Sequence, residues 1–308
     1  MQLNLFNNNL NRPQKIAVDS QKDPRLAIAG SPFKSQLLKW VGNKQRYAGE
    51  IASYFPRRFG TYFEPFLGSG AVLSFLAPKK GVGSDNFKPL IDIWKTLKYN
   101  PETLKEWYAT RLEELLSGEK HTEYENIKAS YNANPNGADL LFLCRSCYGG
   151  VVRFRKTDGY MSTPCGPHNP ISSDSFSQRV DEWYNRTKGT IFYHGEFNDV
   201  LGMAKEGDLV YCDPPYSHTQ SILYGAQNFN LVSLFNVIRD LKNKKIFVAL
   251  SIDGTKKSGN LVCNVPIPDG LFEQEILISC GRSMLRRFQM KDLSLDKEIV
   301  TDRLLLTY

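Results

Sequence analysis

The residues best suited to chemistry form the tetrapeptide Asp213-Pro214-Pro215-Tyr216, which follows an apolar run at residues 209–212. The run predicts a short buried strand, and the prolines end it because each lacks a backbone N–H donor and restricts the residue before it. The tetrapeptide is therefore expected at the carboxyl end of a strand, where open α/β sheets bind ligands. A plain polar turn is the alternative, since Asp and Pro are common turn residues.

A carboxylate, a rigid turn and an aromatic ring together suit the methylation of an exocyclic amine on a flat base. Such an amine is a weak nucleophile because its lone pair is conjugated into the ring. The Asp213 carboxylate and the Pro214 carbonyl can accept its two hydrogens and draw the nitrogen towards tetrahedral geometry. Pro215 would fix the turn, and Tyr216 would stack on the base. Transfer in line from a sulfonium needs no covalent intermediate, so no separate nucleophile is required.

A second pattern, at residues 61–70, predicts a strand, a glycine turn and a helix that begins near Ala71. Gly68 and Gly70 allow the backbone to pass close to a ligand. The next strand ends in Asp85, at the spacing at which βαβ nucleotide sites place an acid for the ribose hydroxyls. A lone Gly-x-Gly is also compatible with an ordinary strand-to-helix turn.

Lys-Trp-Val-Gly-Asn-Lys at residues 39–44 precedes this turn, whose full sequence is Glu-Pro-Phe-Leu-Gly-Ser-Gly at residues 64–70. With Asp85 and the Asp-Pro-Pro-Tyr tetrapeptide, these motifs stand in the order of the Dam-type (D12 class, alpha group) DNA adenine N6-methyltransferases, which the chain resembles over most of its length. One departure is Asn43, where the family has glycine. Asparagine tolerates left-handed backbone better than most residues, so we expect the site to survive.

The resemblance implies an α/β fold, namely a Rossmann-like S-adenosylmethionine-dependent methyltransferase sheet with an inserted, mainly helical DNA-recognition domain. It implies S-adenosylmethionine as the cofactor and no metal. The catalytic residues that it implies are Asp213, Pro214, Pro215 and Tyr216. The cofactor-binding residues that it implies are Trp40, Lys44, Phe66, Gly68, Gly70, Asp85, Glu196, Phe197 and Asp213.

The stretch at residues 140–156 resembles EcoRV-type modification methylases, in which it begins a DNA-reading hairpin. Its cationic and aromatic side chains suit phosphates, guanine edges and base stacking, while a solvated basic loop is the alternative. We leave the recognition sequence open, because GATC methylases typically carry Tyr-Asn-Gly or Phe-Asn-Gly where this chain has Tyr-Gly-Gly. The predicted DNA-binding residues are Lys39, Arg145, Tyr148, Arg153, Arg155 and Lys156.

Loop-forming residues and hydrophobic periodicity divide the chain into three parts. They predict a flexible leader at residues 1–30, a catalytic domain at 31–100 and 188–308, and a target-recognition insertion at 101–187. The finer pattern predicts helices, two loops and strands. The helices are expected at residues 90–99, 101–116 and 231–241, the loops at 131–136 and 163–175, and the later strands at 245–251, 273–280 and 303–308.

Composition agrees with this organisation. The chain has 308 residues, 41% of them hydrophobic, which is enough for a large α/β domain with an insertion. A net charge of +7 favours a polyanionic partner, here double-stranded DNA, and the family default is a monomer. No apolar run approaches the ~20 residues that cross a bilayer, and no signal peptide is evident, so we expect a cytoplasmic protein that makes no membrane contact.

Six cysteines in such a chain favour free thiols over disulfides. Cys144, Cys147, Cys165 and His168 have a spacing close to that of structural zinc sites. The resemblance does not include this set, and cysteine is commonly a small buried hydrophobe. We therefore expect buried thiols here rather than a zinc site.

Together these patterns predict a site-specific DNA adenine N6-methyltransferase that flips its target base out of the duplex. Its setting is a restriction-modification system, with a cognate endonuclease acting on the same site, or an orphan or phage methylase. One alternative changes the amine, to cytosine N4 or to an RNA or protein amide. The other is an inactive DNA-binding homologue, which would be expected to lose Asp213 or Asp85, both of which are present.

Overall fold

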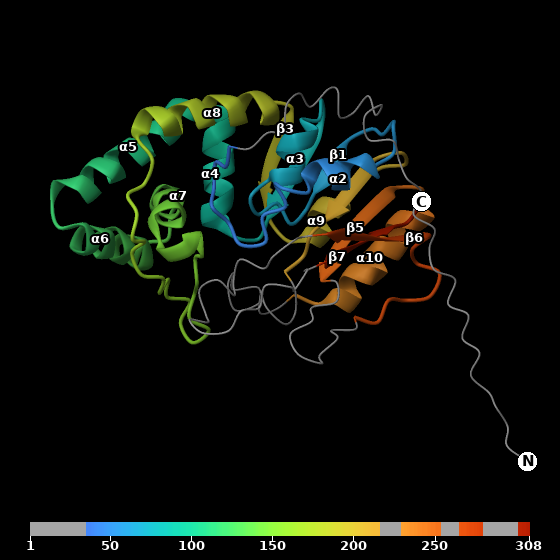
Figure 1. Ribbon diagram of the computed structural model, residues 1–308. Coiled ribbons are helices and arrows are strands. Elements are labelled where there is room, and N and C mark those ends of the chain that lie inside the picture. Colours follow the sequence, from blue (N-terminus) through green and yellow to red (C-terminus); the bar gives the residue numbers. More distant parts are fainter. Residues whose placement is uncertain (1–34, 216–228, 254–264, 280–300) are drawn as a thin grey trace, which may run out of the picture.

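The computed structural model describes residues 35–215, 229–253, 265–279 and 301–308. The helices and strands within these ranges are labelled in Figure 1. Two predictions fall outside them. These are the leader at residues 1–30 and the position of Tyr216.

A sheet with the strand order β3-β2-β1-β4-β5-β7-β6 forms the centre of the described structure. Strands β1 to β5 are parallel, whereas β7 is antiparallel to both of its neighbours, β5 and β6. This arrangement confirms the predicted α/β class. The strands are β1 (Tyr62–Glu64), β2 (Gly81–Asp85), β3 (Thr190–His194), β4 (Leu209–Cys212), β5 (Phe247–Asp253), β6 (Gln274–Ser279) and β7 (Thr301–Leu306).

Strand β4 shows why a central strand is a continuous apolar run. All four of its residues are buried, because helices cover both faces of the sheet. Leu209 and Tyr211 pack in one hydrophobic cluster, to which the helices α2 (Ala48–Ser53) and α3 (Ala71–Leu76) contribute. Val210 and Cys212 point the other way, into a cluster shared with α9 (Phe197–Leu201) and α10 (Leu231–Asn243).

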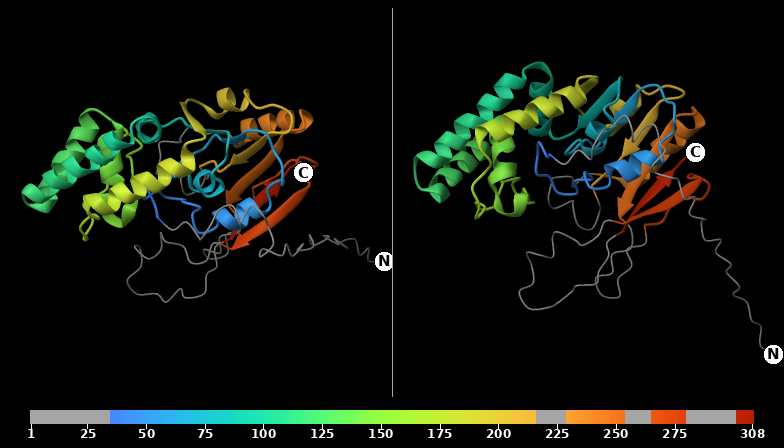
Figure 2. Two further views of the ribbon diagram at one scale, coloured as in Figure 1. Left: turned by 90° about the horizontal axis from the view of Figure 1, so that it is seen from above. Right: turned by 45° about the horizontal axis from the view of Figure 1, so that its top comes forward.

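The chain between β2 and β3 is mainly helical and extends to one side of the sheet (Figures 1 and 2). Polar residues start several of these helices; for example, the Asn100 side chain accepts a hydrogen bond from the backbone N–H of Thr103. The elements are α4 (Lys88–Tyr99), α5 (Pro101–Ser117), α6 (Lys120–Ala133), α7 (Gly137–Ser146), the 3₁₀-helix η2 (Tyr148–Gly150) and α8 (Ser173–Thr187).

The predicted loop at residues 131–136 is wrong in its first half. Tyr131 lies in the last turn of α6, where its ring is buried at helical spacing behind Tyr124 and Ile127. Burial of the Tyr131 ring stabilises the last turn of α6, although the helical pattern of the sequence is weak there. The connection to α7 is therefore confined to residues 134–136.

Helix α4 joins the helical insertion to the sheet. The ring of Trp94 lies 5.6 Å from that of Phe192 in β3 and 5.6 Å from that of Trp183 in α8. The buried residues of the insertion and of this side of the sheet consequently form one continuous hydrophobic cluster. No helix within the described ranges is long and apolar enough to cross a membrane.

Beyond η2 the chain forms an irregular hairpin, which we call the 147–165 hairpin. Antiparallel bridges join Cys147 to Cys165 and Phe154 to Met161. The tip is closed by a 2.9 Å hydrogen bond from the backbone N–H of Arg155 to the carbonyl of Tyr160. The two arms are therefore held together at both ends.

Candidate functional site

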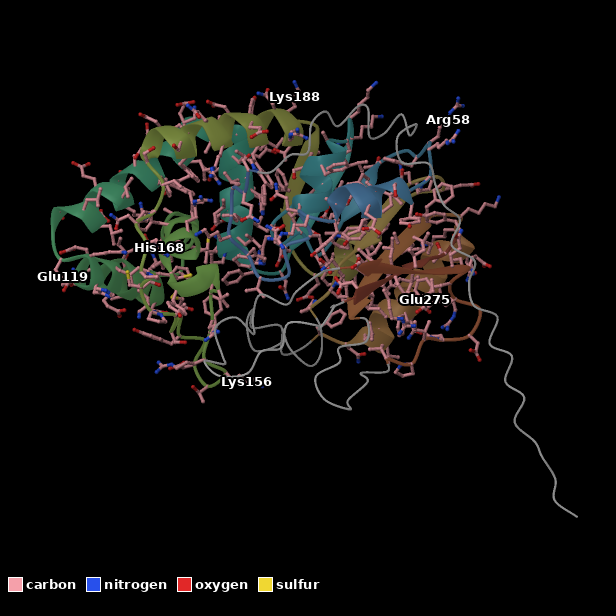
Figure 3. The ribbon with its side chains drawn as sticks, viewed as in Figure 1. Arg58, Glu119, Lys156, His168, Lys188 and Glu275 are labelled. Atoms are coloured by element: carbon pink, nitrogen blue, oxygen red, sulfur yellow. The ribbon has the colours of Figure 1, made fainter. Side chains whose placement is uncertain are left out.

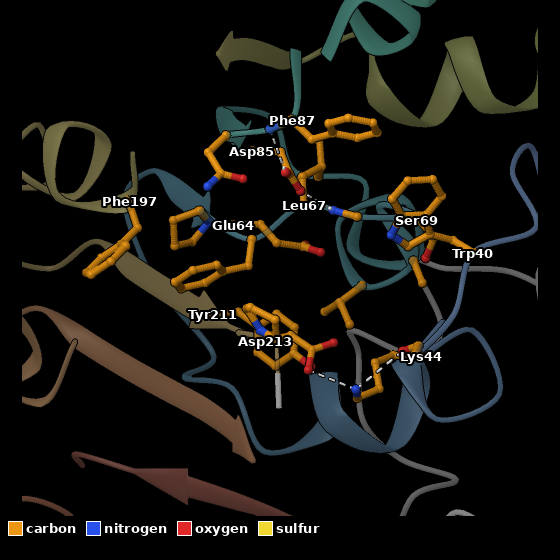
Figure 4. Close-up of a pocket in the computed structure, with 18 of the residues that line it drawn as sticks. Trp40, Lys44, Glu64, Leu67, Ser69, Asp85, Phe87, Phe197, Tyr211 and Asp213 are labelled. Carbon is orange, nitrogen blue, oxygen red and sulfur yellow. Dashed lines mark hydrogen bonds and ion pairs between the residues drawn. The ribbon is translucent and has the colours of Figure 1, made fainter. Parts of the chain in front are cut away.

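Strands β1 to β4 end at the same edge of the sheet, and the strand order reverses between β1 and β4. In an open α/β sheet such a reversal opens a crevice for ligands. A cavity of about 200 Å³ lies at this point (Figure 4). Its walls come from residues 40–44, 64–69, 85–87 and 195–197, together with Asp213 and neighbouring side chains.

Lys44 and Asp213 form an ion pair at this cavity, with 2.8 Å between Nζ and Oδ1 (Figure 4). The Oδ2 atom of Asp302, in β7, lies 3.6 Å from the same Nζ. Lys44 is only 6% exposed, so carboxylates must compensate its charge. Two residues that stand 169 positions apart, one predicted for cofactor binding and one for catalysis, are thus brought into contact.

Glu64, the last residue of β1, is a cavity residue to which the sequence analysis gave no role. Its Oε2 atom accepts a 2.7 Å hydrogen bond from the Tyr62 hydroxyl. Burial raises the pKa of Glu64 to about 8; the bond from Tyr62 opposes this rise, and the charge of Asp213 adds to it. An acid at the end of an apolar strand, directly before Pro65, was the sequence signal for this residue.

We expect the free energy of unfolding of the cofactor-free protein to fall as the pH rises from about 4.5 to about 8. The folded protein keeps a proton on Glu64 that the unfolded chain releases near the usual pKa of 4.5, so the folded state binds more protons across this window. Glu64→Gln stays neutral and should remove about 4 kcal/mol of this decline. Urea unfolding of both proteins near the two ends of the window tests this, and parallel pH profiles would contradict it.

Asp85 closes the opposite wall of the cavity (Figure 4). Its Oδ2 atom accepts a 3.1 Å hydrogen bond from the backbone N–H of Gly68, and its Oδ1 atom accepts a 3.0 Å bond from that of Phe87. Burial raises the pKa of Asp85 to about 6, while these two bonds oppose the rise. The carboxylate is therefore held in one orientation, which suits the recognition of paired hydroxyl groups.

The glycine turn packs between two tryptophan rings. Gly68 and Gly70 both have positive φ, +47° and +60°. A Cβ atom on Gly70 would lie 2.9 Å from Cη2 of Trp94, and one on Gly68 would lie 3.3 Å from Trp40. The turn thus requires glycine both for its backbone conformation and for the space it leaves.

Gly70→Ala should lower the free energy of unfolding by about 2–3 kcal/mol, since it adds a clash with Trp94 to the backbone strain. Gly159→Ala is the matched control, because Gly159 has a φ of +68° and nothing within 4 Å of its added Cβ. Strain alone should cost this control about 1 kcal/mol. Urea denaturation measures both, and equal losses would show that the Trp94 contact has no effect.

Aromatic rings line the cavity beside these polar groups. The rings of Phe66 and Phe197 lie 5.3 Å apart, and that of Trp40 lies 6.3 Å from Phe87. Glu196 also faces the cavity, from the N-cap position of α9. All the predicted cofactor-binding residues except Gly70, which supports the turn from behind, line this one cavity.

Asn43, the departure from the family motif, needs no left-handed backbone. Among the described non-glycine residues, only Ala77 and Lys245 have positive φ. The Asn43 side chain instead accepts a 2.7 Å hydrogen bond from the backbone N–H of Gln45, which closes the turn locally.

Most of the predicted DNA-binding side chains are exposed on or beside the 147–165 hairpin, and Lys156 projects outward at its tip (Figure 3). The stem of Lys39 passes close to Gly150, where an added Cβ would lie 2.9 Å from it. Arg155 is held by both carboxylate oxygens of Asp158 and lies over the Tyr160 ring, 4.2 Å from its centroid. The exposed members are Lys39, Tyr148, Arg153, Arg155 and Lys156.

Arg145 is the exception, and its assignment as a DNA-contacting residue is corrected. Its side chain is only 5% exposed, and its Nη1 atom donates to the carbonyls of Gln36 and Leu37 at 2.8 and 2.9 Å. The guanidinium also lies over the Phe176 ring. The basic sequence around Arg145 predicts a surface group, but every residue of α7 is buried, Arg145 included.

Cys144, Cys147 and Cys165 are buried free thiols at the end of α7 and the base of the hairpin, whereas His168 is exposed (Figure 3). Burial raises the pKa of Cys144 to about 11 and that of Cys147 to about 12. Within the described part of the chain, no three His, Cys, Asp or Glu residues are grouped so that they could hold a metal ion.

A mostly parallel sheet with a carboxylate-lined cavity at its point of strand reversal is the architecture of α/β enzymes that bind ligands at the carboxyl ends of their strands. The family model for D12 class N6 adenine-specific DNA methyltransferases matches residues 40–268. This match covers well over half of the chain. The chain therefore belongs to that family.

Individual relatives agree with this assignment. The chain is 29% identical to the type II methyltransferase M1.LlaDCHI of Lactococcus lactis subsp. cremoris, over 69% of this chain and 79% of that protein. It is 31% identical to the type II methyltransferase M.MjaIII of Methanocaldococcus jannaschii, over 58% of this chain and 68% of that protein. It is 28% identical to the retron Ec67 DNA adenine methylase of Escherichia coli, over 61% of this chain and 65% of that protein.

Proposed function

We propose that this protein transfers a methyl group from S-adenosylmethionine to N6 of a flipped adenine at a specific site in double-stranded DNA. The observation that supports this most strongly is the position of Asp213-Pro214-Pro215 at the end of β4, with Asp213 paired to Lys44 at the cavity. The family to which the chain belongs is defined by methylation of adenine N6 in DNA.

The residues at the cavity fit S-adenosylmethionine. The oriented Asp85 carboxylate suits the ribose hydroxyls, and the rings of Phe66 and Phe197 suit a purine face. Lys44 suits the cofactor's carboxylate. When bound, the cofactor supplies an electrophilic methyl group on a sulfonium. Trp40, Gly68 and Glu196 complete the wall, and Gly70 supports it.

The catalytic step rests on hydrogen-bond acceptors. Asp213 and the Pro214 carbonyl would accept the two hydrogens of the adenine amine, which raises the nucleophilicity of N6 as the methyl group is transferred. Pro215, which lines the cavity, would fix the turn so that both acceptors lie on one side. We assign to Tyr216 the stacking contact with the flipped base, on the motif alone.

Flipping is required because the adenine amino group is paired inside the duplex, and extrusion costs a few kcal/mol. We propose that contacts from Lys39, Tyr148, Arg153, Arg155 and Lys156 offset part of this cost. One cavity serves one base, so a monomer that visits each strand in turn is sufficient. We further propose the setting of a restriction-modification system or of an orphan or phage methylase.

Incubation of the purified protein with unmethylated genomic DNA and S-adenosylmethionine tests the proposal. Modified bases are mapped by single-molecule sequencing, with Asp213→Ala as the inactive control. N6-methyladenine confined to one short motif and absent from the control is the expected result. Modification at cytosine N4 would favour the alternative amine, and an unmodified genome despite intact cofactor binding would favour an inactive DNA-binding homologue.

A further inference from the structure

The backbone just before the Lys39–Lys44 loop is held by side chains of the helical insertion. Arg145, in the last turn of α7, donates from Nη1 to the carbonyls of Gln36 and Leu37, at 2.8 and 2.9 Å. Helix α8 adds two donors: Arg179 donates to the Gln36 carbonyl at 3.1 Å, and the Trp183 indole to the Ser35 carbonyl at 3.1 Å. Three side chains from two helices therefore converge on three consecutive peptide groups.

This segment has no regular structure of its own to fix its path. Residues 35–47 form turns and extended backbone until α2 begins at Ala48. Trp40 stands three residues beyond Leu37 and lines the cavity, and Lys44 follows with its 2.8 Å bond to Asp213. The insertion therefore sets the direction in which the chain enters the cavity wall.

Burying a charged guanidinium costs desolvation free energy, so Arg145 is an unfavourable choice if its only role is to fill space. Arg145 is 5% exposed, and its hydrogen-bond partners are the carbonyls of Gln36 and Leu37 and the hydroxyl of Tyr108, so none of these bonds neutralises its charge. An apolar side chain of similar volume would fill the space at a smaller desolvation cost. The gain that arginine offers is geometric, because the two N–H groups on its planar Nη1 atom can hold two adjacent carbonyls in a fixed relation.

Resting on the proposed function, we infer that Arg145 is a positioning residue for the methyl donor, acting from the recognition insertion through residues 36–37 on Trp40 and Lys44. It does not touch the donor itself. Its loss should weaken binding of S-adenosylmethionine while leaving the transfer step nearly intact once the cavity is filled, because Asp213 and Pro214 are unchanged.

Arg145→Met is the test, with Arg111→Met as its matched control. Arg111 is also a partly buried arginine of the insertion, but it binds Asp139 at 2.7 Å within the helices and does not contact residues 35–37. Calorimetric titration with S-adenosylmethionine, without DNA, measures Kd. We expect Arg145→Met to raise Kd about tenfold or more, with kcat at saturating donor within about threefold. Arg111→Met should lower Tm comparably and leave Kd within about twofold.

Two milder variants cover the case in which Arg145→Met does not fold. Arg145→Lys keeps the charge but not the planar guanidinium, and Trp183→Phe keeps an aromatic ring but removes the donor to Ser35. Each should raise Kd about two- to fivefold. An unchanged Kd in the Arg145 variants, or an equal rise in Arg111→Met, would overturn the inference. Absence of donor binding by the unaltered protein would instead overturn the proposed function, so the two failures are distinguishable.

Discussion

Asp213→Asn is expected to lower kcat for methyl transfer by about 10³-fold. The substitution preserves the shape of the side chain but replaces a carboxylate, which accepts at both oxygens, with a neutral amide that accepts at one. Loss of one preorganised acceptor at a developing charge costs about 10²–10³ in rate, and the lost negative charge adds to this. The effect should fall on kcat, because the acceptor is needed most as N6 becomes tetrahedral.

Asp302→Asn is the matched control for this variant. Asp302 approaches the same Lys44 ammonium, at 3.6 Å rather than 2.8 Å, but does not line the cavity. Its substitution should change kcat by no more than about threefold. Single-turnover methylation of a duplex at saturating donor measures both variants. Comparable losses in the two would show that the charge around Lys44, rather than the Asp213 acceptor, controls the rate.

Lys44→Met should both destabilise the protein and abolish most of its affinity for the methyl donor. The ammonium is paired with Asp213 and Asp302, so its removal leaves two carboxylates without a compensating cation. Breaking a buried pair from one side costs about 3–5 kcal/mol, and the partial exposure of Asp213 brings the expected loss to about 2–3 kcal/mol. We expect Kd for S-adenosylmethionine to rise about 100-fold.

The double variant Lys44→Met/Asp213→Asn separates these contributions. If uncompensated charge is the cause, removing the Asp213 charge should restore about half of the lost stability. Donor affinity should not return, because the cation is still missing. Urea unfolding and calorimetry on the two single variants and the double variant complete the cycle, and strictly additive stability losses would rule out a direct Lys44–Asp213 coupling.

The candidate-site residues whose place at the sheet edge could be predicted from the sequence are those with local signals at strand ends. Asp85 follows a strand directly, and the Asp213 motif stops one with two prolines, so each residue reaches the common sheet edge by its own short-range pattern. The glycine turn before α3 works in the same way. Because β1 to β4 are parallel, their carboxyl ends lie at one edge of the sheet, and the residues that follow them come together there.

Glu64 and Arg145 show what local signals do not contain. The pKa of Glu64 depends on burial and on Asp213, which is contributed by another strand. Arg145 was assigned to DNA because its neighbours in sequence are basic, yet its acceptors are the carbonyls of Gln36 and Leu37, more than 100 positions away. The prediction of a loop at Tyr131 also failed for lack of a local signal. Its ring is buried by contacts within the insertion, and such contacts leave no mark on the neighbouring sequence.

The single hydrophobic cluster shared by the insertion and the sheet limits how a new target sequence can be acquired. An exchange of the whole insertion between relatives would have to match buried partners such as Trp94 and Trp183 across the junction, and a mismatch there would destabilise the entire protein. The exposed part of the 147–165 hairpin is different, because its arms are joined to each other at both ends. Under the proposed function, sequence specificity can therefore diverge through this short segment while the fold, the cavity and the chemistry stay constant.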